Sequence, residues 1–198
     1  MFKKDISAGA KSKLKSSIQR GIRGKILSTY PLLTPYIDEI LPKKSQLDLI
    51  KLPDRISLYA LGADPLFFQH MDDALLPALR LVHRFPGCWA KVRVDRGAIR
   101  FVLSGATLMV PGLTSKGGWL PPVGGGRETE EGEGGGDAWD TGPLERGEPV
   151  VVEAEGKEEA CMVGVLAMST NEMREKGKGV AVEGGHYLGD GLWRLQLD

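Results

Sequence analysis

Six basic side chains lie between positions 80 and 100, and their types and spacing suggest chemistry more clearly than any other group in the chain. They are Arg80, Arg84, Lys91, Arg93, Arg96 and Arg100, with Asp95 as the one acid among them. Guanidinium and ammonium groups attract phosphate and release counterions on contact, so such a cluster is typical of nucleic-acid binding. A solvated charged face is the structural alternative. The cluster alone leaves both interpretations open.

A second group of cations lies near the N-terminus. Residues 1–25 hold eight basic side chains and one acid, Asp5. Apolar residues recur every four positions from Leu14 through Ile18 and Ile22 to Ile26, which predicts a helix with one apolar stripe. Cations that point away from this stripe form a second predicted RNA-binding face, made of Lys11, Lys15, Arg20 and Arg23.

Small residues follow the first basic cluster. Gly105-Ala106 and Pro111-Gly112 bracket a short predicted strand. Such residues allow a nucleotide backbone to approach the main chain and its amides closely. Ordinary turn and capping chemistry explains the same residues, and both interpretations can hold together. His186-Tyr187 is a further candidate for stacking on a base, although a partly buried position near a strand end is the favoured interpretation.

Catalytic and metal-binding patterns are weak. His70, His83 and His186 lie far apart in the sequence, and the chain contains no H-E-x-x-H motif and no P-loop. Cys88 and Cys161 lack a second thiol at metal-ligand spacing, so buried, reduced thiols are expected. We therefore expect a protein that is not an enzyme, with no catalytic residue, no metal and no cofactor, although residues distant in sequence could still converge in space.

The charges of the chain are segregated. Its 26 basic and 26 acidic residues balance. Residues 124–148, however, hold eight acids against Arg127 and Arg146. The surrounding segment 121–149 is rich in glycine and poor in β-branched residues, so it cannot bury enough apolar surface to offset the entropy of ordering. We predict a disordered acidic insert there. Setting it aside leaves a basic protein.

The first ninety residues predict a small α/β unit. Helices are expected over 14–26, which Pro31 ends, over 36–41 with Thr34 as its N-cap, and over 75–83. Short β-like runs lie at 47–51, 55–60 and 66–68.

The second half predicts a mostly β, barrel-like unit. A strand end leads into one helical segment that closes at Gly105, and a strand at 107–110 follows. A hairpin is expected at 150–154 and 161–168, a helix from the capping box Ser169–Glu172 to Gly177, and strands at 180–183 and 192–197. The fold class is α+β, with the N-terminal α/β domain packed on the C-terminal barrel.

No stretch approaches the ~18 to 20 apolar residues of a membrane span, so a cytoplasmic protein with no membrane contact is expected.

Residues 94–113 resemble the opening of a PUA domain, an RNA-binding module, and residues 177–183 and 186–193 are similar to its closing strands. Together with the segments 1–4, 41–44 and 77–86, they make the chain resemble the malignant T-cell-amplified-sequence family from end to end, apart from the acidic insert. The resemblance implies a pre-PUA domain over 1–90 and a PUA pseudo-barrel over 91–198.

The resemblance also implies a function. Members of that family are ribosome-associated factors that act in initiation, reinitiation and removal of deacylated tRNA from the small subunit, with a density-regulated-protein-type partner. Small-subunit rRNA, possible contact with tRNA, and a heterodimer are therefore expected, and Phe101 and Trp119 are the predicted partner-binding residues. An RNA-modification enzyme or accessory subunit with a PUA domain is the alternative, although ninety residues are too few for its catalytic domain. A protein adaptor is a third possibility.

Overall fold

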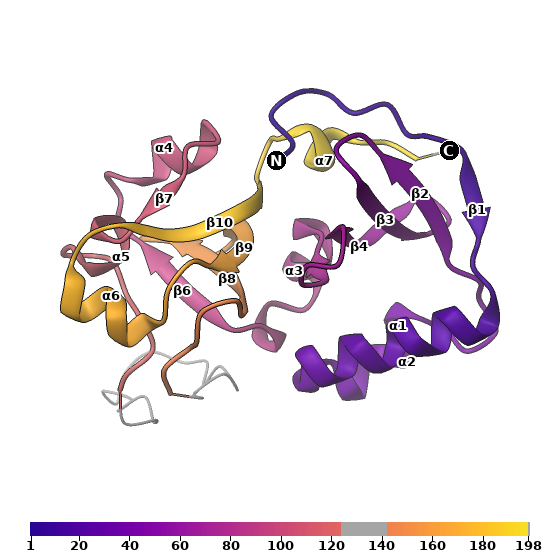
Figure 1. The fold of residues 1–198 in the computed structure, drawn as a ribbon, viewed down its shortest axis with the longest axis horizontal. Coiled ribbons are helices and arrows are strands. Elements are labelled where there is room, and N and C mark those ends of the chain that lie inside the picture. The colour runs from indigo at the N-terminus through magenta and orange to yellow at the C-terminus, as the bar shows by residue number, and fades with distance from the viewer. Residues whose placement is uncertain (124–141, 198) are drawn as a thin grey trace.

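The computed structural model describes residues 1–123 and 142–197. In these ranges the chain forms two five-stranded sheets that lie side by side (Figure 1). The N-terminal sheet is antiparallel throughout, with strands in chain order. Its strands are β1 (Lys11–Lys13), β2 (Asp48–Leu52), β3 (Ile56–Leu61), β4 (Asp64–His70) and β5 (Leu76–Pro77).

Strands β2 and β3 form because their apolar residues alternate along the chain. In β3 every second side chain, from Ile56 through Leu58 to Ala60, is buried while its neighbours are partly exposed. This period of two matches a sheet with one face on the core. Asp54 and Arg55 adopt positive φ angles of 58° and 59° in the tight turn between the strands. The predicted strands at 47–51, 55–60 and 66–68 are therefore confirmed.

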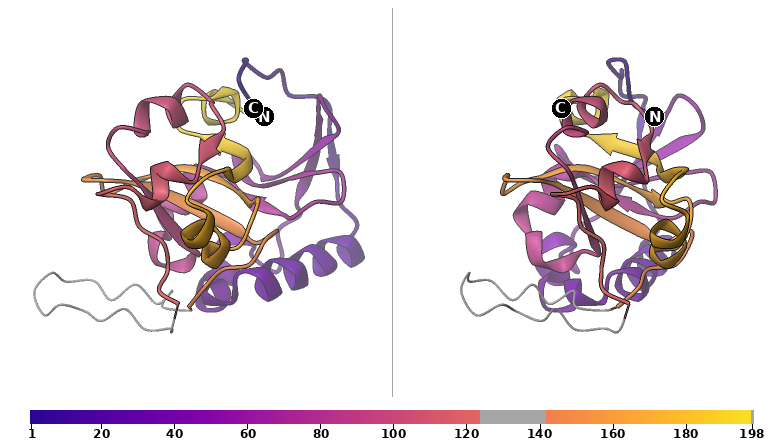
Figure 2. Two further views of the ribbon diagram at one scale, coloured as in Figure 1. Left: turned by 60° about the vertical axis from the view of Figure 1, so that its left-hand side comes forward. Right: turned by 90° about the vertical axis from the view of Figure 1, so that its left-hand side faces the viewer.

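Helix α1 (Ser16–Thr29) lies beneath one end of this sheet (Figures 1 and 2). Only part of the predicted apolar stripe is buried on the helix: Ile26 is fully buried and Ile22 partly, whereas Ile18 is 50% exposed. Leu14 is buried as well, but it precedes the helix. A spacing of four residues overshoots the helical turn by about 40° at each step. Ile18 has therefore rotated away from the face on which Ile26 packs.

For two predicted helices in the N-terminal half, the predicted first residues were wrong. Thr34 does not cap a helix, because it lies inside the 3-10 helix η1 (Pro31–Tyr36), and its hydroxyl donates to the carbonyl of Pro31 at 2.6 Å. Helix α2 (Ile37–Ile40) follows. The helix predicted at 75–83 begins only at α3 (Leu79–Arg84), since Leu76 precedes a proline and stays extended in β5. The 3-10 helix η2 (Pro86–Cys88) ends this half.

The C-terminal sheet has the order β6-β8-β9-β10-β7. Its first pair, β6 with β8, is parallel and the others are antiparallel. The strands are β6 (Lys91–Val94), β7 (Leu108–Met109), β8 (Pro149–Ala154), β9 (Ala160–Leu166) and β10 (Val180–Tyr187), and the short helices α4 (Ile99–Leu103), α5 (Pro111–Thr114) and α6 (Thr170–Lys176) connect them. This curled sheet confirms the predicted pseudo-barrel.

The capping box predicted at the start of α6 is present. The amide of Glu172 donates to the Ser169 hydroxyl at 3.2 Å, and the amide of Ser169 donates to the Glu172 carboxylate at 3.0 Å. Gly177 ends the helix with a φ of 60°, a conformation that favours glycine. The local sequence thus fixes both ends of α6.

The acidic insert was predicted too wide. Leu144 is buried in the C-terminal core, its amide donates to the Thr170 hydroxyl at 3.0 Å, and the amide of Gly147 donates to the carbonyl of Leu166 at 2.8 Å. The part of the predicted disordered segment over 142–149 is therefore attached to the fold by hydrogen bonds, although residues 145–148 are exposed. Residues 124–141, which carry most of its acids, lie outside the described part of the chain.

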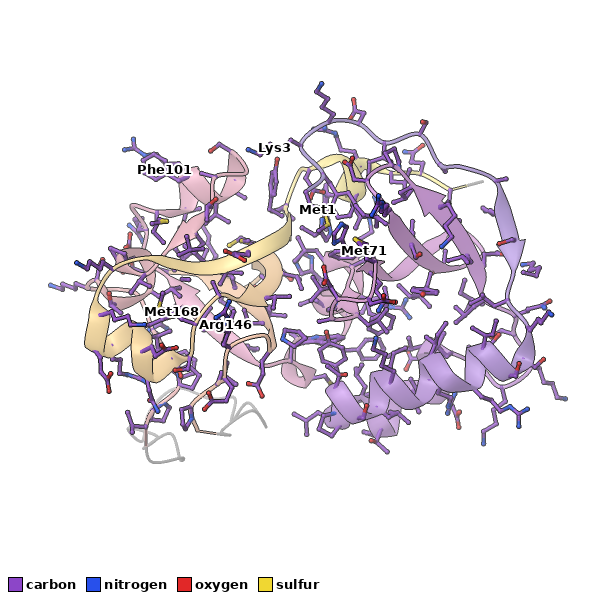
Figure 3. All side chains as sticks on the ribbon, in the orientation of Figure 1. Met1, Lys3, Met71, Phe101, Arg146 and Met168 are labelled. Carbon is purple, nitrogen blue, oxygen red and sulfur yellow. The ribbon has the colours of Figure 1, made fainter. Side chains whose placement is uncertain are left out.

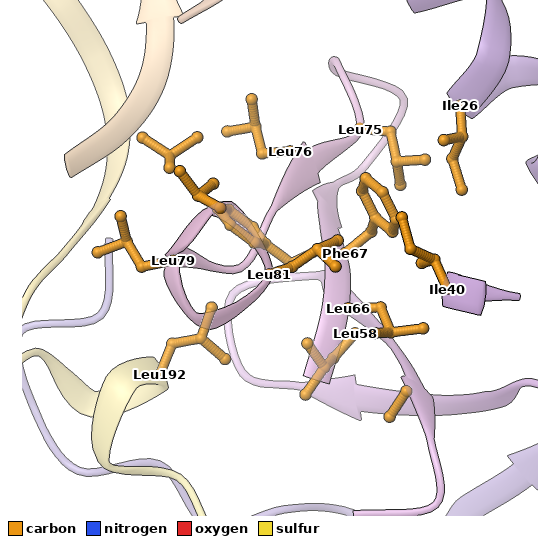
Figure 4. Packing of buried hydrophobic residues seen from close by; sticks show 14 of the residues in the cluster. Ile26, Ile40, Leu58, Leu66, Phe67, Leu75, Leu76, Leu79, Leu81 and Leu192 are labelled. Carbon is orange, nitrogen blue, oxygen red and sulfur yellow. The ribbon is translucent and has the colours of Figure 1, made fainter. Parts of the chain in front are cut away.

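The last predicted strand is a helix. Asp190 accepts a hydrogen bond from the amide of Trp193 at 2.9 Å and so starts α7 (Gly191–Arg194) where a strand over 192–197 was expected. Leu192, Leu195 and Leu197 then pack into the core of the N-terminal half. Figure 4 shows Leu192 among the side chains of that core. The two halves of the sequence therefore share one of the two cores.

A buried histidine and aspartate lie where β10 meets the N-terminal core. His186 and Asp190 are each 1% exposed, and Nδ1 of the imidazole lies 2.9 Å from both carboxylate oxygens. The amide of Tyr187 also donates to this carboxylate. The imidazole ring meets the rings of Phe2 and Phe68 edge-on, at centroid distances of 6.0 and 5.9 Å. The favoured interpretation of His186 as a satisfied core residue is confirmed.

Replacing Asp190 with alanine removes the acceptor for the imidazole and for two amides inside the protein. Because buried donors are then left unsatisfied, we expect the free energy of unfolding to fall by about 2–4 kcal/mol, measured by urea denaturation. The control is Asp5→Ala. It breaks the exposed ion pair between Asp5 and Arg194, which lies on α7, the helix that Asp190 caps. It should cost far less. Equal losses for the two variants would contradict the assigned role of Asp190.

Candidate nucleic-acid interface

A groove of about 410 Å³ lies between the loop after α4 and strand β10. Its walls include Gly105, Ala106 and Thr107 on one side and Tyr187 on the other. Gly105 ends α4 with a φ of +74°. A Cβ atom at this position would lie 2.7 Å from the hydroxyl oxygen of Tyr187. Glycine is therefore required both by the backbone conformation and by the approach of the tyrosine ring.

Tyr187 enters the groove as a neutral phenol. Burial raises the pKa of its hydroxyl, and the nearby carboxylate of Asp190 raises this pKa further. Its backbone amide donates to the carboxylate of Asp190, which also contacts Nδ1 of His186. The phenol therefore keeps its proton and presents a donor and an acceptor beside the main chain of Gly105.

A bulge in β10 forms another part of the wall. The register with β9 shifts between Glu183 and His186, and Gly184 adopts a φ of +64°. Glu183 and Gly184 are exposed at this bulge, and both line the groove. The bulge therefore leaves main-chain atoms accessible next to the groove.

The N-terminus supplies the remaining groups. Met1 and Lys3 line the groove, and Figure 3 shows them between the two halves of the molecule. Burial lowers the pKa of the terminal amine, which Asp190 opposes by attraction. Lys3 and Glu183 bring one charge of each sign. Shape and main-chain groups, more than net charge, therefore define what this groove accepts.

The six cations predicted from the first cluster do not form one patch. They are spread over α3, β6 and the loop and helix around α4 (Figure 1). On α3, Arg80 donates to the carbonyl of Trp193 at 2.7 Å and lies over its indole ring. Arg84 lies 3.7 Å from Glu39. These two arginines therefore make contacts within the protein.

The cations of β6 are tied into the fold. Lys91 pairs with Glu153 at 2.8 Å, and its side chain is only 10% exposed. Nε of Arg93 donates to the carbonyl of Gly117 at 3.2 Å. Arg96 and Arg100 differ, because both are exposed on the segment that leads into the glycine loop. Within the cluster, these two are best placed to meet a nucleic acid near the groove.

The second pair of small residues has a structural role at one position. Gly112 is buried in α5, where a Cβ would lie 3.1 Å from the Cβ of Ala98. Pro111 is exposed at the start of the helix. Neither residue lines the groove beside Gly105. The structure thus separates the two glycines that the sequence offered as equivalent.

The four predicted N-terminal cations lie in two different places. Lys11 belongs to the edge strand β1 and Lys15 precedes α1, and both are exposed. Arg20 and Arg23 line a separate pocket of about 500 Å³ together with two lysines of the following loop, Lys43 and Lys44. Sequence reasoning did not assign Lys3, Lys43 or Lys44 to a site. Their position in short basic runs was the signal that could have indicated them.

The two predicted partner-binding residues have different surroundings. Phe101 is 52% exposed on α4, and the guanidinium of Arg100 lies 4.7 Å from its ring centroid. Leu103 and Met109 are also exposed, so α4 and β7 carry apolar surface. Trp119 is partly buried, and its main chain pairs with Arg93 through two hydrogen bonds. Phe101 is therefore the more accessible of the two.

Over residues 1–123 and 142–197, no three His, Cys, Asp or Glu side chains come together as a metal site. Nor does any helix there have the length and apolar character needed to cross a membrane. Cys88 and Cys161 are buried free thiols, as expected, and burial raises the pKa of Cys161 to about 12.

Comparison with family models matches both halves of the chain. Residues 2–86 match the Pre-PUA-like domain, and residues 91–191 match the PUA domain described for elF2D.

Solved archaeal structures share the fold. A hypothetical protein from Pyrococcus horikoshii has a TM-score of 0.67 at 20% identity, covering 93% of this chain and 98% of its own. A PUA domain protein from Aeropyrum pernix has a TM-score of 0.63 at 23% identity, covering 95% and 90%.

Curated relatives are more similar in sequence. Translation machinery-associated protein 20 of Schizosaccharomyces pombe is 47% identical over 93% of this chain and 91% of its own length. The Saccharomyces cerevisiae protein of that name is 45% identical over the full length of both. Malignant T-cell-amplified sequence 2 of Homo sapiens is 36% identical over 92% and 90%. The chain therefore belongs to the family of translation machinery-associated protein 20 and the malignant T-cell-amplified sequence proteins.

Proposed function

We propose that this chain is a translation factor that binds RNA of the small ribosomal subunit through the groove beside Gly105. The observation that carries the proposal is the convergence of an αL glycine, a neutral tyrosine and a glycine bulge on one groove in a PUA domain. The names of the relatives support a role connected with translation.

The groove is suited to nucleotides more than to diffuse polyanion contact. Gly105 and Gly184 leave the main chain accessible, and the Tyr187 phenol can donate or accept a hydrogen bond. Protein contacts to single-stranded RNA commonly read base edges and the ribose hydroxyl with such groups. Lys3 lines the groove and Arg100 lies on α4, the helix that precedes Gly105, so both would add an electrostatic contribution.

The finer role that we propose is action in initiation and reinitiation and in removal of deacylated tRNA, in the cytoplasm, with tRNA as a further ligand. A density-regulated-protein-type partner is proposed to bind the apolar surface of α4 and β7, with Phe101 at its centre. Exposed aromatic residues flanked by arginine are frequent anchors of protein interfaces. Trp119 stays a prediction, because its side chain is partly buried.

A carboxylate placed in the groove should weaken RNA binding. Ala106→Glu adds one at an exposed position of the glycine loop, so we expect affinity for purified small ribosomal subunits to fall about tenfold, roughly 1–2 kcal/mol. Sedimentation with the subunits measures it. Thr114→Glu is the control, since it adds the same charge at an exposed residue of α5 outside the groove. If both variants bound like the original protein, the groove would not be the RNA site.

Truncation of the exposed aromatic ring should separate partner binding from RNA binding. Phe101→Ala is expected to lower affinity for the density-regulated-protein-type partner by about 2 kcal/mol or more, as for a central interface anchor. Isothermal titration calorimetry measures this affinity, and sedimentation with small subunits should be unchanged. Ile18→Ala, at an apolar side chain of similar exposure on α1, serves as the control. Undiminished partner affinity in Phe101→Ala would place the partner elsewhere.

A further inference from the structure

The pocket beside α1 is a second concave site, distinct from the groove of the PUA domain. It has a volume of about 500 Å³ and lies between α1 and the loop at 41–46. Four cations line it: Arg20 and Arg23 from the helix, and Lys43 and Lys44 from the loop.

The loop is fixed against the helix by hydrogen bonds. The side-chain amide of Gln19 donates to the carbonyl of Ser45 at 2.9 Å and accepts from the amide of Leu47 at 3.1 Å. Nη1 of Arg23 donates to the carbonyl of Leu41 at 2.7 Å. Both ends of the loop are thus attached to α1. The backbone that carries Lys43 and Lys44 is therefore held beside Arg20 and Arg23 before any ligand arrives, which lowers the entropy cost of binding.

The charges of the pocket are unbalanced. Asp38 contacts Arg23 at 2.5 Å and Lys43 at 3.6 Å, and the hydrogen bond from Arg23 is the main cause that lowers the pKa of this carboxyl. Within the described part of the chain, Arg20 and Lys44 form no ion pair. No acidic residue lies in the first turn of α1. Among the described residues, four cations thus face one carboxylate that contacts them, Asp38, and the pocket carries an excess of positive charge.

Fold stability does not require the two lysines. The side chain of Lys43 is 78% exposed, and Lys44 is also exposed. An exposed pair such as Lys43 with Asp38 contributes little to stability in water. Gln19 and Arg23 already hold the loop in place. The lysines are thus free to serve a ligand.

We propose that this pocket binds backbone phosphates of the same RNA that enters the groove, and the inference therefore rests on the proposed function. The guanidinium of Arg20 can bind phosphate oxygens in bidentate fashion, and Lys43 and Lys44 add point charges. Both Nη atoms of Arg23, in contrast, already contact Leu41 and Asp38. The pocket lies by α1 in the N-terminal half, whereas the groove is lined by the loop after α4 and by β10 in the C-terminal half, together with Met1 and Lys3; Figure 1 shows α1 and α4 in different halves of the molecule. The ligand is thus an extended or folded RNA that spans both halves, not a single nucleotide.

Neutralising the two lysines tests the pocket. The double variant Lys43→Gln, Lys44→Gln should bind purified small ribosomal subunits about tenfold more weakly, and the slope of log affinity against log potassium chloride should become shallower by about two. The matched control, Lys176→Gln with Lys178→Gln at the end of α6, removes the same charge outside the pocket. It should leave the slope nearly unchanged. Urea denaturation should show equal stability for both.

The outcomes separate the two proposals. If the original protein did not bind the subunits, the proposed function itself would fail. If it bound, but the pocket variant behaved like the control, the pocket inference would fail and the groove would stand. If the pocket variant kept its RNA affinity and instead lost binding to polyglutamate, an acidic protein would be the ligand, which overturns the assignment to RNA.

Discussion

The buried contact between His186 and Asp190 is the constraint on which the arrangement of both halves depends. One carboxylate accepts from the amide of Tyr187 at the end of β10 and from the amide of Trp193 at the start of α7, so the chain must turn there. The imidazole packs against Phe2 and Phe68 of the N-terminal core. A single buried acid therefore directs the C-terminal leucines onto the opposite half and joins the two sheets into one structure.

The groove depends on this junction. Phe2 is buried in the N-terminal core, and its carbonyl accepts from the amide of Gly191 at 2.7 Å. Lys3 follows directly and so reaches the groove beside Gly105. Tyr187, on the other wall, is held by the same carboxylate. The N-terminal segment thus helps to build a site that the PUA domain alone does not complete, because neither Met1 nor Lys3 belongs to that domain.

Local patterns predicted much of the fold, and long-range contacts account for what they missed. Alternation in β3 and the capping box of α6 depend on neighbours in sequence, so these elements were predictable. The helix α7 was read as a strand because its apolar residues serve a core formed by the distant N-terminal half. The basic cluster was read as one patch because sequence spacing does not show that Lys91 pairs with Glu153. In the groove, Gly105 and Ala106 were predicted, whereas Lys3 depends on the buried position of Phe2.

Cross-linking by ultraviolet light tests the central claim most directly. The original protein would be bound to purified small ribosomal subunits, irradiated, and digested, and mass spectrometry would identify the peptides that carry nucleotides. The account predicts RNA attached within residues 102–107 or 180–187 of the groove, and also within 41–46 beside α1. Attachment confined to other surfaces, such as α6, or no attachment at all, would contradict it.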